Sequence, residues 1–189
     1  QGGLVIMRVF EMPEIGTLVK QWKTMKVPAI MAGFFSPLAG SDAWKIFDGK
    51  IGGVLNTTFE LGSGMAASKL PASIDFMKKY QRKYGEEIQA GHGPAPSYES
   101  VYILKEAIER TGSVEPDAIV AGLEKTDRQG AMGRIRYDAG HQAVYGFDPA
   151  ETSVSVVFQW TDGGKRVVVF PDSLAENVIQ LPAGLKSLK

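Results

Sequence analysis

The sequence predicts an α/β protein in which short strands and helices alternate, with parallel strands near its start. Three observations lead to this fold class. A strand–helix–strand pattern fills the first 33 residues, amphipathic helix patterns follow between residues 74 and 111, and a hairpin pattern lies between residues 154 and 170. The opening pattern has about 30 residues, the length of a βαβ unit, whose two strands run parallel.

The opening unit begins with Leu4–Met7, a continuous apolar run typical of a strand buried on both faces. A helix follows, because apolar residues recur at the three- and four-residue spacing of one helix face. Those residues are Ile15, Leu18, Val19, Trp22 and Met25, and the opposite face carries Lys20, Lys23 and Lys26. Pro28 marks the end of this helix, and Ala29–Ala32 is the second predicted strand.

The middle of the chain continues this alternation. Residues 53–59 are rich in β-branched side chains and form the third predicted strand, and residues 62–71 are a predicted loop. Apolar spacing predicts a helix over residues 74–84, with Gly85 at its end. Residues 89–96 (Gln-Ala-Gly-His-Gly-Pro-Ala-Pro) form a stiff, irregular link, which we interpret as a crossing between two structural units.

Beyond the link, the patterns predict two more helices, a strand and a hairpin. Ser97 is in the position of a helix cap, and Gly112 is in the right place to stop that helix. Pro116 suits the first turn of a short helix, and residues 134–137 read as a strand. The turn sequence Thr-Asp-Gly-Gly-Lys at residues 161–165 predicts the hairpin between residues 154–160 and 166–170.

The composition excludes several function classes. Lys and Arg number 21, as do Asp and Glu, so the chain is neutral overall and lacks the basic excess of a nucleic-acid binder. Without Cys, it has no disulfide, zinc–thiolate site, iron–sulfur cluster or cysteine nucleophile. No apolar run approaches the roughly 20 residues that cross a bilayer. Because the chain starts at Gln1 with no Met and no signal peptide, we expect a processed product or a piece of a longer protein.

No motif indicates catalysis, a cofactor or a metal. Residues 62–67 fit the dinucleotide pattern G-x-G-x-x-A, but Pro71 would break the helix that this fingerprint needs, so a flexible loop is the better interpretation. His92 and His141 lie far apart and outside any H-E-x-x-H pattern, and His141 resembles a turn residue. The chain also lacks a G-x-S-x-G elbow. We therefore expect no catalytic residues, no cofactor and no bound metal.

Candidate binding residues follow the carboxyl ends of the predicted strands, because open α/β sheets bind ligands outside those ends. The first strand leads to Arg8, Phe10 and Glu11, the second to Phe34, Phe35 and Ser36, and the third to Thr57, Thr58 and Glu60. Aromatic walls with a few polar groups suit a small-molecule pocket. The alternative for the three phenylalanines is a place in the core or at an interface. His92, between two glycines of the link, is either a surface histidine or a binding residue.

Several segments match one known family in their order and spacing. These are residues 11–23, 27–30, 76–85 (FMKKYQRKYG), 97–113 (SYESVYILKEAIERTGS), 132–138 and 158–171. Together they resemble the second half of type I periplasmic substrate-binding proteins of the branched-chain amino acid (Leu/Ile/Val) class, which serve ABC transporters. The resemblance covers almost all of the chain. No single segment is diagnostic, and the specificity comes from their order.

The resemblance implies a fold of two doubly wound, Rossmann-like α/β lobes, joined by three crossings and closing on a ligand in the cleft. Family members are much longer, so this chain corresponds to a C-terminal portion whose N-terminal part is missing. By analogy, residues 1–89 are the later part of the second lobe, residues 90–149 return to the first lobe, and residues 150–189 cross back with the hairpin. We expect unpaired strand edges, and we expect the missing half to be another piece, left out of the structure, or replaced by a partner chain.

The resemblance also assigns the site residues. In the family, the loop after the first of these strands supplies an aromatic or polar wall, which Arg8, Phe10 and Glu11 match. The next loop often supplies an acid for the ligand's ammonium, whereas residues 34–36 are Phe-Phe-Ser, which favours a less cationic or more aromatic ligand. The crossing segment often brings an aromatic side chain to the cleft, and His92 is the nearest equivalent.

The function implied is that of a non-catalytic solute-binding component of an ABC transporter, located in the periplasm or outside the cell, either free or as a lipoprotein. It would close on an amino acid or related organic acid and present it to the transporter permease. One alternative is a sensor or regulator domain that uses this fold to detect amides or amino acids. An enzyme with a doubly wound fold is a third hypothesis, because one fold hosts many functions.

Overall fold

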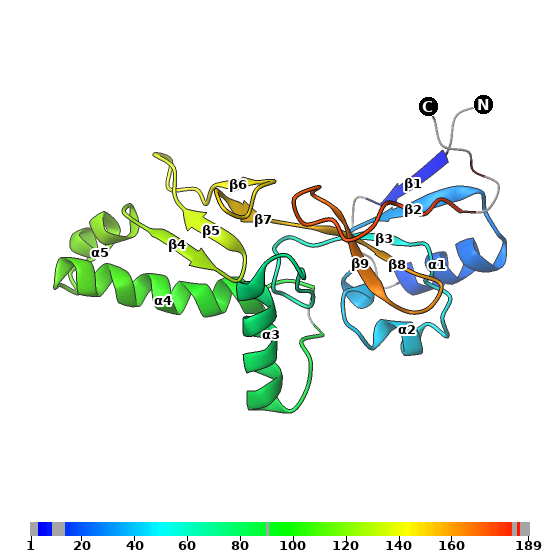
Figure 1. Cartoon of the computed structure of the whole chain (residues 1–189), viewed down its shortest axis with the longest axis horizontal. Coiled ribbons are helices and arrows are strands. Elements are labelled where there is room, and N and C mark those ends of the chain that lie inside the picture. The colour runs from blue at the N-terminus through cyan, green and yellow to red at the C-terminus, as the bar shows by residue number, and fades with distance from the viewer. Residues whose placement is uncertain (1–3, 9–13, 90, 183–184, 186–189) are drawn as a thin grey trace.

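Two separate sheets, which lie towards opposite ends of an elongated chain, organise the structure (Figure 1). The computed structural model describes residues 4–8, 14–89, 91–182 and 185. The larger sheet contains, in spatial order, β1 (Leu4–Arg8), β2 (Ala29–Gly33), β3 (Leu55–Thr57), β8 (Val157–Trp160) and β9 (Arg166–Phe170). β1, β2 and β3 run parallel, and β8 and β9 join them as an antiparallel hairpin. The predicted α/β class is confirmed.

Helix α1 (Ile15–Thr24) crosses between β1 and β2, as its apolar spacing predicts. Ile15, Val19 and Trp22 are buried, and the Trp22 indole donates a hydrogen bond of 2.9 Å to the main-chain oxygen of Ala29. Leu18 is 40 % exposed, so the buried face of the helix is narrower than the sequence suggests. The short 3₁₀ helix η1 (Ser36–Leu38) and helix α2 (Ala43–Ile46) follow β2 along the chain.

Strand β1 forms one edge of the larger sheet. The expectation that it is buried on both faces is wrong here: Ile6 packs against the core, but Val5 and Met7 are 50 % and 71 % exposed. Within the described part of the chain, β1 pairs with β2 alone, and its other hydrogen-bonding edge pairs with no strand. This is the unpaired strand edge that the sequence predicts.

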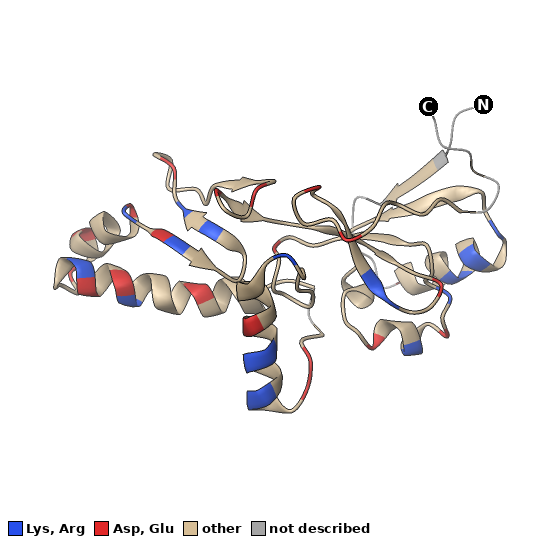
Figure 2. Ribbon diagram, viewed as in Figure 1, with Lys and Arg blue, Asp and Glu red and all other residues tan. Residues whose placement is uncertain are grey.

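The second unit combines three helices with the smaller sheet. The helices are α3 (Pro71–Tyr84), α4 (Pro94–Thr111) and α5 (Pro116–Leu123). The sheet contains β4 (Asp127–Gly130), β5 (Gly133–Arg136), β7 (Ser153–Val154) and β6 (Tyr145–Gly146), in that order. Gly85 and Gly112 follow α3 and α4 in the left-handed conformation, as predicted. Strands β4, β6 and β7 were not expected from the sequence. Figure 2 shows acidic and basic residues mixed along α4 and the neighbouring strands.

Two hydrophobic cores correspond to the two units. The chain leaves the first core after Leu70, enters the second with Phe76 of α3, and returns to the first between Ile135 and Val154. Within residues 1–89, Phe76 belongs to the second core, and its ring packs against that of Tyr98 of α4 with centroids 4.9 Å apart. The assignment of residues 1–89, 90–149 and 150–189 to lobes of a complete protein stays a prediction.

A buried carboxylate joins α4 to strand β4 in the second unit. Glu99 is 2 % exposed. Its carboxylate accepts a hydrogen bond of 2.7 Å from the Ala131 main-chain N–H and forms an ion pair of 2.7 Å with Arg128. Gly130 lies so close that an added Cβ would approach the Glu99 carboxylate to 2.5 Å. The second core is therefore fixed by one fully engaged acid as well as by apolar packing. In the described part of the chain, no helix is both long and apolar enough to cross a membrane.

Candidate functional site

Three aromatic side chains gather where β2 and β3 end, and we call Phe34, Phe59 and His92 the aromatic cluster. The Phe34 and Phe59 rings are stacked, with centroids 4.3 Å apart and planes 25° apart. The His92 ring lies 6.1 Å from that of Phe34 and 5.7 Å from that of Phe59. Phe34 is half-buried, His92 is exposed, and Phe59 is 57 % exposed. The cluster therefore presents aromatic surface to solvent at the carboxyl edge of the parallel strands.

Asn56, on β3, fixes the main chain that carries Phe34. Its fully buried carboxamide accepts a hydrogen bond of 2.8 Å from the Phe35 N–H and donates one of 3.0 Å to the Phe35 oxygen. Both main-chain groups of Phe35 are therefore held, and its side chain lies in the first core with no exposed surface. The core alternative therefore holds for Phe35, which corrects its assignment as a wall of the site.

The polar side chains beside the cluster are engaged within the fold. Glu60, 5 % exposed, accepts a hydrogen bond of 2.7 Å from the Gly93 main-chain N–H. The Thr58 hydroxyl accepts one of 3.1 Å from the Val156 N–H and donates one of 3.3 Å to the Val156 oxygen. The loop after β3 is thus tied both to the start of α4 and to the segment that returns into β8.

Tyr145, on β6, brings an aromatic side chain of the second unit close to this loop. Its burial, and after that the negative charge of Glu60, raises the pKa of the Tyr145 phenol. The side chain is still 49 % exposed. The second sheet therefore contributes an accessible phenol that feels the negative charge of Glu60.

Arg166, on β9, holds the loops that follow β2 and β3. Its guanidinium donates hydrogen bonds of 2.5 Å to the main-chain oxygens of Ala39 and Gly64. Desolvation by burial lowers the pKa of Arg166. The Arg166 side chain therefore links two loops that are far apart in sequence.

The structure brings together part of the site that the sequence predicts. Phe34 and His92 meet in the aromatic cluster, and Thr57 ends β3 in a half-buried position. Ser36 begins η1, just beyond the cluster. Arg8 ends β1 and pairs with Gly33, so its main chain lies beside the end of β2.

Other site residues lie outside the description or were missed. The side chain of Arg8 and the whole of Phe10 and Glu11 lie outside the described residues. Phe59 was missed because the sequence analysis placed it within the third strand, which ends at Thr57. Its signal was present, since a phenylalanine two residues after a parallel strand lies at the ligand-binding edge. Among the residues described, no three His, Asp or Glu side chains form a group that could hold a metal ion.

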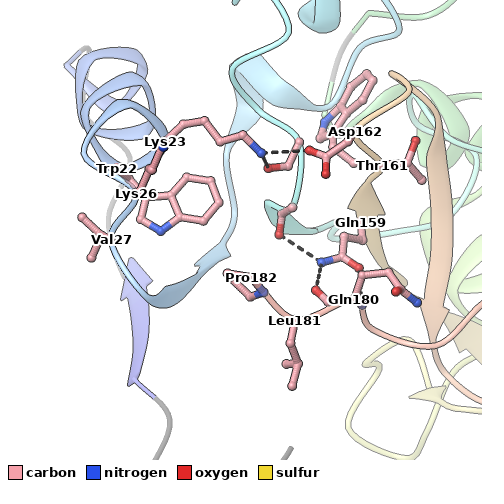
Figure 3. Close-up of a pocket in the computed structure, with 13 residues that line it drawn as sticks. Trp22, Lys23, Lys26, Val27, Gln159, Thr161, Asp162, Gln180, Leu181 and Pro182 are labelled. Atoms are coloured by element: carbon pink, nitrogen blue, oxygen red, sulfur yellow. Dashed lines mark hydrogen bonds and ion pairs between the residues drawn. The ribbon is translucent and has the colours of Figure 1, made fainter. Parts of the chain in front are cut away.

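A cavity of about 560 Å³ lies at the end of the larger sheet opposite the aromatic cluster, beside the residues that precede β2 and β3 (Figure 3). Its lining includes Trp22, Lys23, Val27, Gln159, Asp162 and Leu181. Lys23 forms hydrogen bonds of 2.8 Å with the Gly52 oxygen and the Asp162 carboxylate. The Gln159 carboxamide donates to the oxygens of Gly53 and Gln180 and accepts from the Gln180 N–H. These contacts attach the C-terminal segment to the sheet, and none of the predicted site residues lines this cavity.

Comparison with known proteins gives one family. The family model described as "Periplasmic binding protein" matches residues 7–165. The curated relative "Leu/Ile/Val-binding protein homolog 7" from Brucella melitensis is 30% identical over 118 residues, which are 59% of this chain and 27% of that protein. The chain therefore spans about a quarter of the length of the curated relatives that it matches.

Solved structures support the same fold. A leucine-binding protein from Thermotoga maritima matches with a TM-score of 0.60 and 26% identity, over 82% of this chain and 41% of that one. The branched-chain amino acid transporter substrate-binding protein of Streptococcus pneumoniae, solved with isoleucine, matches with a TM-score of 0.57 and 22% identity, over 84% and 42%. The fold is that of type I periplasmic binding proteins, of which this chain covers a part.

Proposed function

The chain belongs to the periplasmic binding protein family, and on that basis we propose that it is part of a solute-binding protein that holds a small organic molecule between two lobes. The observation that carries this proposal is the aromatic cluster at the carboxyl ends of β2 and β3. Open α/β sheets bind ligands at that edge, and ligand pockets combine aromatic walls with a few polar groups. The names of the relatives, which bind Leu, Ile and Val, support an amino acid or related acid as ligand.

The proposed site extends the cluster along the strand ends. It contains Phe34, Phe59 and His92, with Ser36 and Thr57 beside them and with Arg8, Phe10 and Glu11 following β1. The loops after β2 and β3 are held by Asn56 and Arg166, so these rings are in place before a ligand arrives. A preformed site of this kind loses less conformational entropy on binding.

The proposed mechanism is closure of two lobes about the segments that cross between them. In this chain, those segments are residues 71–75 and 136–153, which connect the two cores. A ligand that contacts both lobes stabilises the closed form by its differential affinity for that form. The closed form would then be the one that an ABC transporter permease recognises, in the periplasm or at the cell exterior. Catalysis has no role in this mechanism.

Native mass spectrometry of the natural full-length protein, followed by a denaturing spectrum, tests the proposal. We expect a small adduct that is lost on denaturation, and titration calorimetry should then show saturable binding of an amino acid or organic acid without turnover. Phe34→Ala should weaken this binding, and Tyr84→Ala, an exposed aromatic on α3 outside the cluster, should leave it unchanged. If a panel of amino acids and organic acids shows no binding, the proposal is wrong.

A further inference from the structure

Within the described part of the chain, Phe59 is an exposed ring of the aromatic cluster. Its ring stacks on Phe34 at 4.3 Å, yet 57 % of the residue remains exposed. An exposed phenylalanine forgoes most of the stabilisation that burial of its ring would give. His92, whose ring is tilted by 55° to that of Phe59, stands 5.7 Å away. Phe34 therefore covers one face of the Phe59 ring and His92 lies beside it, an arrangement to which one more planar ring can be added.

Two polar side chains near the aromatic cluster that could bind an ammonium group are engaged within the fold. An amino acid ligand needs an acceptor for its charged nitrogen, because a buried unpaired charge is costly. In the described part of the chain, the acid and amide beside the cluster are Glu60 and Asn56. Glu60 is 5 % exposed and binds the Gly93 N–H, and Asn56 is fully buried and binds Phe35. Both side chains are therefore committed to main-chain partners, and little of either is exposed.

We infer that the ligand presents a planar aromatic ring to Phe59 and His92, so that the site takes an aromatic carboxylic acid in preference to a branched aliphatic amino acid. This inference rests on the proposed function and names its substrate class. A branched alkyl chain would bury similar area against Phe59, but it lacks the ring quadrupole that favours stacked and edge-to-face pairs. Aromatic character, more than size, should therefore decide which ligand binds.

Matched pairs of acids separate ring character from size. Titration calorimetry of the natural full-length protein would compare benzoate with cyclohexanecarboxylate, and phenylacetate with cyclohexylacetate, using leucine as the aliphatic amino acid. We expect each aromatic acid to bind about two- to tenfold more tightly than its saturated partner, the range that one aromatic pair contributes. Equal affinities within both pairs would overturn the inference.

A substitution at Phe59 tests whether the preference for aromatic acids arises at this residue. Phe59→Leu keeps an apolar side chain at an exposed position, so it should fold normally and lose the preference for aromatic over saturated acids. Tyr84→Leu is the matched control, because Tyr84 is 56 % exposed and is also paired with another ring, that of Tyr80. It should keep the preference. An unchanged preference in Phe59→Leu would also overturn the inference.

The outcomes distinguish this inference from the proposed function. Tight binding of leucine with no binding of the aromatic acids would overturn the inference and leave the solute-binding function standing. Absence of binding for leucine and for all four acids would count against both. Binding of the aromatic acids in a manner that depends on Phe59 supports both.

Discussion

Replacement of Asn56 by Ala tests how strongly the site is held from within. The buried carboxamide satisfies the Phe35 N–H at 2.8 Å and supplies a second donor, at 3.0 Å, to the Phe35 oxygen, which also accepts from the Leu38 N–H. The variant leaves a buried N–H without its partner, which costs about 1–3 kcal/mol, and removes a further hydrogen bond worth about 1 kcal/mol. We therefore expect the free energy of unfolding to fall by about 2–4 kcal/mol. In a chain of this length, that lowers Tm by roughly 5–15 °C.

The assay is urea and thermal unfolding followed by circular dichroism, with Asn177→Ala as control. Asn177 is exposed and its side chain binds only the neighbouring Val178 N–H among its described contacts, so its loss should change the free energy by less than about 0.5 kcal/mol. A loss in Asn56→Ala no larger than in this control would refute the reasoning that Asn56 fixes the main chain after β2.

Three further predictions concern charged groups. Glu99→Gln should lower the free energy of unfolding by about 1–3 kcal/mol in urea titrations, because it removes the buried partner of Arg128. Arg166→Met should have an effect of similar size and should speed amide hydrogen exchange in the loops that its guanidinium holds. Glu60→Gln should move the pKa of Tyr145 down toward its usual value of about 10, read from tyrosinate absorbance with Tyr145→Phe as the reference. Because the pKa of Tyr145 is raised on folding, its contribution to stability is complete below pH ~10 and is lost as pH rises through the folded-state pKa.

Each of these predictions has a contradicting result. Glu99→Gln with unchanged stability would mean that the ion pair offsets no more than its own desolvation. Unchanged exchange in Arg166→Met would show that the loops are held by other contacts. An unshifted or raised pKa of Tyr145 in Glu60→Gln would show that burial alone perturbs this phenol.

Local patterns predicted most of the larger sheet. Helix α1, strands β2 and β3, and the β8–β9 hairpin follow from apolar spacing and turn residues that act within a few positions of each other. Strand β4 was not predicted because its residues, Asp-Arg-Gln-Gly, are polar and do not alternate with apolar residues. It is a strand because β5 pairs with it along its length, which is tertiary context that overrides propensity.

The candidate site also has one part that the sequence predicts and one part that depends on distant contacts. That Phe34 and His92 line one surface follows from strand order and from the position of the link. Phe35 lies in the core, and its main chain binds Asn56, which is 21 residues away in sequence. Spacing within one strand end cannot tell which of two adjacent phenylalanines faces solvent, because that depends on contacts with residues distant in sequence.

The start of α4 shows why the predicted cap was wrong and how the two units are coupled. Ser97 lies inside the helix, where its N–H binds the Gly93 oxygen at 3.0 Å. The caps come from the loop after β3 instead: Glu60 accepts from the Gly93 N–H and Ser63 from the Ala95 N–H, at 2.7 and 3.1 Å. A helix of the second unit thus has its first donors satisfied by the loop that carries Phe59. Any hinge motion that keeps these two hydrogen bonds must move that loop together with the start of α4, so the bending has to occur outside this loop.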